Sequence, residues 1–178
     1  MVVVTVPFAK PPNGELGAVE FTKILENLLM NDNPMTEIIY GNHHKEILNI
    51  ETAQGRKDPE VRAFYTKLKE HSLHLDIRSF EADDESLKDS DLVIGHLLYS
   101  SDPDMLQALQ NLLDEYGVVS IVEVDYSTHR LSLVSLELFD TPSLIVYVNE
   151  GSLDLFERFA EDLAEFCLLY EDRNIPSV

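Results

Sequence analysis

The sequence predicts an α/β fold in which a mostly parallel sheet carries helices on both faces. Short apolar runs typical of strands alternate along the 178 residues with segments whose apolar residues recur at helical spacing. Such alternation favours parallel strands joined by helical crossovers. The run "DLVIGHLL" (91–98) is almost continuously apolar, as expected for a strand that is covered on both faces.

Residues 1–72 are expected to form an N-terminal elaboration of strands and helices. "VVVTV" (2–6) has the composition of a strand, and "MTEIIYG" (35–41) predicts another. Between them, apolar residues at helical spacing predict an amphipathic helix over 18–31. Asp58 followed by Pro59 predicts the start of a further helix.

Residues 73–178 have a more regular pattern, and the two parts could also form one continuous domain. "LHLDIRSF" (73–80) alternates apolar and polar residues, which predicts a half-buried strand. Further strands are predicted at 118–125 and 143–151, and a helix at 103–116 that ends at Gly117. In a long final helix, seven residues at helical spacing are expected to face the core: Leu153, Leu155, Phe156, Phe159, Leu163, Phe166 and Leu169.

The acidic residues are concentrated in the second part. The net charge is −20, yet residues 1–71 hold 10 acidic and 8 basic residues, against 23 and 5 in residues 72–178. So few bases disfavour direct binding to nucleic acid, because phosphate contacts require Lys and Arg. The acidity either keeps the protein soluble or attracts a partner with a basic surface.

Membrane, disulfide and cofactor signals are weak. No segment approaches the roughly 20 apolar residues of a membrane helix, and the first residues lack the basic start of a signal peptide. Cys167 excludes an internal disulfide because it is the single cysteine, and its apolar surroundings predict an inert core position. A cytoplasmic protein without a cofactor is therefore expected, of unknown oligomeric state.

The candidate catalytic and metal sites are all incomplete. The seven glycines form neither a dinucleotide-binding nor a Walker motif. The pairs His43–His44 and His71–His74 lack the third and fourth ligands of a metal site, and exposed loop positions are expected for them. A serine, histidine and aspartate triad could be drawn from Ser101, His96 or His129, and Asp125, but no nucleophile elbow surrounds Ser101.

The stretch "SSDPD" (100–104) opens the helix that follows the 91–98 strand. Ser101 or Asp102 is a suitable N-cap, Pro103 suits the first turn, and Asp104 complements the positive helix end. Helix capping explains every residue of this stretch. Serines at this place could also hold a sugar phosphate, although Asp102 and Asp104 would repel it.

From residue 73 onward the order of elements resembles a thioredoxin-like domain. Ser101–Asp104 takes the place of the redox tetrapeptide and keeps its proline, and "FDTPSLIVYVNEG" (139–151) resembles the Thr-Pro strand of that family, with Pro142 in the cis-proline position. Both redox cysteines are absent, so the resemblance implies a domain without thiol–disulfide chemistry.

This resemblance leads to a non-enzymatic adaptor as the expected function, with a basic protein as its partner. The expected binding residues lie near the tetrapeptide and on the final helix: Ser101, Asp102, Asp104, Thr141, Pro142, Asp154, Glu157, Glu161 and Glu165. The alternative is a doubly wound α/β enzyme or sensor that binds a small phosphorylated ligand. Whether the protein is an enzyme stays open, with the missing redox cysteines favouring the adaptor.

Overall fold

The computed structural model of the chain describes the parts from which the sheet and three long helices are built. The described residues are 2–7, 9, 15–32, 36–41, 57, 59, 66, 72–81, 87, 89–96, 103–124, 132, 135–136 and 141–174. In chain order the elements are β1 (Val2–Val6), α1 (Leu16–Asp32), β2 (Glu37–Tyr40), β3 (Leu73–Phe80), β4 (Leu92–His96), α3 (Pro103–Leu113), β5 (Val119–Glu123), β6 (Ser143–Asn149), the 3-10 helix η2 (Leu153–Leu155) and α5 (Phe156–Asn174). None of the described helices combines the length and the apolar composition needed to cross a bilayer.

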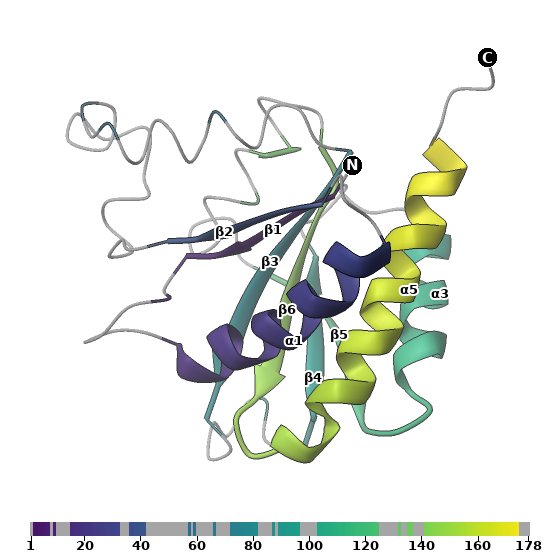
Figure 1. The fold of residues 1–178 in the computed structure, drawn as a ribbon. Coiled ribbons are helices and arrows are strands. Elements are labelled where there is room, and N and C mark those ends of the chain that lie inside the picture. Colours follow the sequence, from purple (N-terminus) through teal and green to yellow (C-terminus); the bar gives the residue numbers. More distant parts are fainter. Residues whose placement is uncertain are drawn as a thin grey trace.

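The six strands form one sheet in the order β2-β1-β3-β6-β4-β5. β2, β1, β3 and β6 are parallel, whereas β4 runs antiparallel to β6 and pairs with β5 in parallel. The prediction of a mostly parallel α/β sheet is therefore confirmed. The carboxyl ends of β1, β3 and β6 lie at one edge, and α1 starts beside them (Figure 1).

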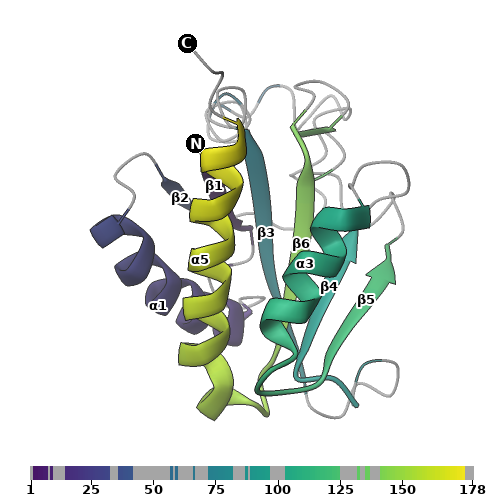
Figure 2. The same ribbon diagram turned by 90° about the vertical axis from the view of Figure 1, so that its right-hand side faces the viewer.

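The three long helices pack on a single face of the sheet (Figure 2). Alternate strand residues such as Val4, Leu75, Ile94 and Val146 point toward these helices and are buried. Helices on both faces were predicted, yet α1, α3 and α5 share this one. In this layer α1 meets the start of α5, where the rings of Phe21 and Phe156 stack edge to face at 5.5 Å.

The strands of the N-terminal segment belong to the same sheet as the strands of residues 73–178. β1 pairs with β3 from Val2 to Thr5, so the two segments share backbone hydrogen bonds. A boundary at residue 72 stays a prediction, because nothing observed shows whether either segment folds without the other.

The final helix follows the predicted pattern, with two exceptions. Five of the expected core residues are buried or half-buried, but Leu153 is 51% exposed and Leu169 is 49% exposed. Leu153 lies in η2, so the 3.6-residue period of α5 does not extend to it. The buried stripe of α5 continues through Cys167 to Tyr170, which leaves Leu169 beside it.

Candidate functional site at the carboxyl edge of the sheet

β3 directs a row of polar side chains to the face of the sheet opposite the three helices. His74 and Asp76 are fully buried, and Arg78 is 5% exposed. β3 was predicted to be half-buried, and this prediction is wrong because both of its faces are covered. Polar groups in such a position must be paired, since an unpaired buried charge is strongly unfavourable.

His74 lies between two hydroxyl groups from the neighbouring strands. Its Nε2 shares a hydrogen bond of 2.7 Å with Thr5 Oγ1, and its Nδ1 shares one of 2.9 Å with Ser143 Oγ. The ring therefore has a partner at each nitrogen. His74 was expected at an exposed loop position, but it is a core residue of β3.

Asp76 and Arg78 form a buried ion pair two residues apart along β3. Arg78 Nε donates to Asp76 Oδ1 at 2.8 Å and Arg78 Nη2 donates to Oδ2 at 2.9 Å, which is bidentate geometry. Burial by itself would lower the pKa of Arg78, but the charge and hydrogen bonds of Asp76 raise it above its ordinary value. The guanidinium is thus a fixed positive charge on this face.

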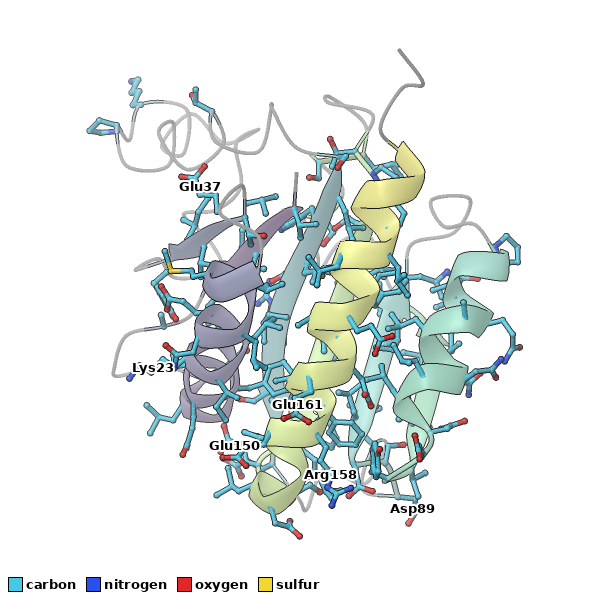
Figure 3. All side chains as sticks on the ribbon, turned by 45° about the vertical axis from the view of Figure 1, so that its right-hand side comes forward. Lys23, Glu37, Asp89, Glu150, Arg158 and Glu161 are labelled. Atoms are coloured by element: carbon cyan, nitrogen blue, oxygen red, sulfur yellow. The ribbon has the colours of Figure 1, made fainter. Side chains whose placement is uncertain are left out.

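Two glutamates extend the polar row to the carboxyl edge. Glu15 precedes α1: its Oε2 accepts a hydrogen bond of 3.1 Å from the Ser79 backbone N–H, and its Oε1 lies 4.0 Å from Arg78 Nη1. Glu150 follows β6, and its Oε1 accepts from Ser79 Oγ at 2.7 Å and from the Gly17 N–H at 3.0 Å. Figure 3 shows Glu150 at this end of the molecule, between the first turns of α1 and α5.

Gly17 permits this arrangement. A Cβ at this position would lie 2.7 Å from Glu150 Cγ, which is closer than real Cβ contacts. A side chain at residue 17 would therefore force the Glu150 side chain to shift. The positive end of the α1 dipole also favours the negative charge.

Tyr147 lies opposite Arg78 on β6 and completes the row. Burial is the main cause that raises the pKa of its phenol, and the charges of Asp76 and Glu15 add to it while Arg78 opposes it. The phenol therefore stays protonated at neutral pH. Gly95 on β4 makes room for the ring, since a Cβ there would lie 3.2 Å from Tyr147 Cε2.

Glu15, like Glu150 and Tyr147, is partly exposed, whereas the ion pair beside it is buried. Its side chain is 24% exposed, against 6% for Arg78 and 0% for Asp76. A carboxylate held by a backbone N–H beside a buried guanidinium can accept a proton from water or bind a donor group of a ligand. Among the residues with described positions, no group of three or more His, Cys, Asp and Glu side chains could hold a metal ion, so this part of the chain does not fit a metal centre.

Of the predicted binding residues, two lie at the amino end of β6, four lie on η2 and α5, and the others lie outside the described residues or are described only in their backbone. Ser101 and Asp102 lie outside the described residues, as do His43, His44 and His71, and Asp104 is described only in its backbone. Thr141 is buried and Pro142 half-buried; Pro142 O accepts a hydrogen bond of 2.9 Å from the His74 N–H at the amino end of β6. Four acidic residues are exposed on η2 and α5, as expected: Asp154, Glu157, Glu161 and Glu165.

Sequence reasoning missed the polar row itself. Its signal was present as an acidic and a basic residue two apart, Asp76 and Arg78, within a strand whose other residues are mainly apolar. Residues at this spacing point to the same face of a strand, where opposite charges can pair. Glu15 and Glu150 had no comparable signal, because 135 positions separate them along the chain.

Several solved structures share the fold over nearly the whole chain. A metallo-carboxypeptidase from Burkholderia cenocepacia matches with a TM-score of 0.67 and 12% identity, covering 98% of this chain and 58% of the other. N-formylglutamate amidohydrolase from Ralstonia eutropha JMP134 matches with a TM-score of 0.61 and 11% identity, covering 98% of this chain and 94% of the other. The catalytic domain of CwlV, an N-acetylmuramoyl-L-alanine amidase from Bacillus (Paenibacillus) polymyxa var. colistinus, gives 0.57 and 15%, covering 96% and 97%.

These identities are low, so the likenesses establish the fold and leave the function to be inferred. No protein-family model matches the chain, and no curated protein matches it by sequence.

The comparisons overturn the thioredoxin-like assignment. The matching folds span nearly the whole chain, including the N-terminal segment that has no counterpart in the thioredoxin family. The prediction of a non-enzymatic adaptor is also wrong, because it depended on that assignment and the structures that match are hydrolases. Missing redox cysteines carry no information about function in a fold that does not use them.

Proposed function

We propose that the protein is a hydrolase that cleaves an amide bond between an acyl group and an amino acid or peptide. The observation that supports this proposal is the near full-length likeness to N-formylglutamate amidohydrolase, at a TM-score of 0.61, and to an amidase catalytic domain of similar extent. The names of the matching proteins share this chemistry. The alternative function drawn from the sequence was an enzyme or a sensor, and a hydrolase agrees with the first of these.

The position of the polar cluster supports the same proposal. In open α/β sheets, ligands bind in the crevice outside the carboxyl ends of the strands. Glu15 lies at this edge, beside the end of β3 and the start of α1. A substrate carbonyl bound here would have an accessible carboxylate within reach.

In this proposal Glu15 is the general base that takes a proton from the attacking water. Its Oε2 is held by the Ser79 N–H and its Oε1 faces Arg78, so the side chain has a defined orientation. Arg78 acts as a positioning residue for Glu15, because Asp76 fixes the guanidinium from the other side. One of the matching structures is a metallo-carboxypeptidase, but no step assigned to these residues involves a metal.

A small phosphorylated ligand is less well supported at this edge. The free N–H groups at a helix start are the usual partners of a phosphate. At α1 the Gly17 N–H already donates to Glu150, and the charges of Glu150 and Glu15 would repel an anion. The cytoplasmic location stays a prediction.

The test is a panel of N-formyl, N-acetyl and N-succinyl amino acids and short peptides, with release of free amine as the measurement. Each assay is run with and without added divalent metal ions. We expect release from at least one class of substrate. Glu15→Gln should lower kcat/KM about a hundredfold or more, because it removes the proton acceptor and keeps an oxygen for the Ser79 N–H.

Glu20→Gln on the exposed face of α1 is the matched control and should retain full activity. If no substrate of the panel releases amine, the hydrolase proposal fails. If activity is present but Glu15→Gln retains it, the hydrolase stands and the role of Glu15 is refuted.

A further inference from the structure

An apolar patch is exposed at the end of the molecule where α3 ends and η2 begins. It consists of Tyr116, Val118 and Leu153, which are 38%, 55% and 51% exposed. Exposed apolar side chains that lie close together can mark a site for a partner. We refer to these three residues as the end patch.

The surroundings of Gly117 place the α3–β5 turn beside η2. Gly117 lies between Tyr116 and Val118, and a Cβ there would be 2.8 Å from the Phe159 ring and 3.1 Å from Leu155 Cδ1. The turn is thus pressed against η2 and the first turns of α5, close to Leu153. Figure 1 shows the end of α3 and the start of α5 at the same end of the molecule.

Most of the charged residues on the segments that form the end patch are acidic. Four acidic side chains are exposed on these segments: Asp114, Glu115, Asp154 and Glu157. Arg158 is the basic residue of these segments, and its guanidinium already lies 4.5 Å from the centre of the Tyr116 ring. Figure 3 shows Arg158 and Asp89 at this end of the molecule.

The charges of nearby carboxylates raise the pKa of two groups at this end, and Arg158 opposes both shifts. The charge of Glu115 is the main cause that raises the pKa of Tyr116. Burial and then the charges of Glu115, Glu165 and Glu161 raise the pKa of Asp162, on the same stretch of α5. An occupant that brings positive charge would relieve this repulsion.

The exposed apolar side chains and the negative charge near them together restrict which molecule could bind the end patch. A second copy of the chain would bring the same negative end to the interface, and an anionic lipid surface or a nucleic acid would be repelled as well. We propose that the end patch docks a segment of another protein in which apolar side chains are flanked by Lys or Arg. The proposal is independent of the hydrolase proposal, since it uses no residue of the polar row.

The experiment measures the binding of short labelled peptides by fluorescence anisotropy. The probe peptide has leucines spaced between lysines; in one comparison peptide glutamate replaces each lysine, and in the other serine replaces each leucine. We expect the probe to bind and both comparison peptides to bind more weakly. Its affinity should fall with added salt, because exposed charges are screened.

Two double variants locate the binding. Val118→Ser with Leu153→Ser should lower the affinity for the probe about tenfold, as expected for truncation of central apolar contacts. Met30→Ser with Leu169→Ser is the matched control, because these side chains are 61% and 49% exposed on α1 and α5 outside the end patch. The control should bind like the unchanged protein, and thermal unfolding verifies that both variants are folded.

Three results would overturn the proposal. They are no binding of the probe, equal weakening in both double variants, and equal binding of the peptide that lacks leucine. The last result would reduce the interaction to charge attraction without an apolar contact. Hydrogen-exchange protection of residues 114–118 on addition of the probe is a second supporting observation.

Discussion

The two faces of the central sheet are both buried, but they are stabilised by different interactions. On the helix face, residues such as Leu75 and Val146 pack against α1, α3 and α5 as a mainly apolar layer. On the opposite face, Asp76 pairs with Arg78 and His74 has a hydroxyl partner at each ring nitrogen. The same strand, β3, supplies both sets.

The difference shows how one strand can serve two purposes. Apolar burial is non-directional, so the helix face can be maintained by many combinations of side chains. A buried ion pair requires defined geometry, because each charge is costly once its partner is lost. The second face therefore stabilises the fold less efficiently, but it can hold functional groups in fixed positions.

The largest expected effect is that of Arg78→Met, which leaves Asp76 buried without its partner. We expect unfolding in urea to show a loss of about 3–5 kcal/mol. Ile77→Val, one position along on the helix face, is the control and should cost about 0.5–1.5 kcal/mol, as removal of one buried methyl group does.

The double variant Asp76→Leu with Arg78→Met sharpens this comparison. With both charges replaced by apolar groups, much of the lost stability should return. If Arg78→Met by itself costs less than Ile77→Val, the ion pair does not organise the second face.

A smaller effect is expected for Gly95→Ala on β4. The new methyl group would lie 2.8 Å from Val124 Cγ1 and 3.2 Å from Ile145 Cβ, so the packing around Tyr147 must shift. Such overpacking costs about 1–3 kcal/mol, measurable by urea unfolding. Adding Val124→Ala removes the nearest atom and should recover part of the lost stability. If the effects of the two substitutions on the free energy of unfolding are strictly additive, crowding by Val124 is not the cause.

The smallest effect is expected at Asp162, a carboxylate on the helix side with a buried Oδ2 that lacks a hydrogen-bond partner. Burial first, and then the nearby carboxylates, raise its pKa in the folded protein. The stability that the protonated Asp162 contributes is therefore fully present below the pKa of this group in the unfolded chain, which is about 3.9. It is lost as the pH rises through the higher pKa of the folded protein.

Asp162→Asn should accordingly make the protein slightly more stable at neutral pH and flatten the fall in stability above about pH 4. Thermal unfolding across this range measures the effect, with the exposed Glu20→Gln as the control. Lower stability of Asp162→Asn at neutral pH would show that this carboxylate has a favourable partner, as Asp76 does.

Part of the candidate site could be predicted from the sequence, and part could not. The alternation in "LHLDIRSF" places His74, Asp76 and Arg78 on one face of a strand, which is a local property. Their burial depends on what covers that face, and their partners Thr5 and Ser143 come from β1 and β6. Glu15 and Glu150 meet at Ser79 only because β3 and β6 pair beside the start of α1.

The sequence by itself determined the order of strands and helices and most of the apolar stripe of α5, because these depend on periodicity over a few residues. The tertiary structure decided the strand order β2-β1-β3-β6-β4-β5 and with it the fold that replaces the thioredoxin-like assignment. It also decided that the polar side of β3 is covered and that Leu153 is exposed. The physical reason is that periodicity reports which side chains share a face, whereas burial and pairing depend on contacts between residues far apart in the chain.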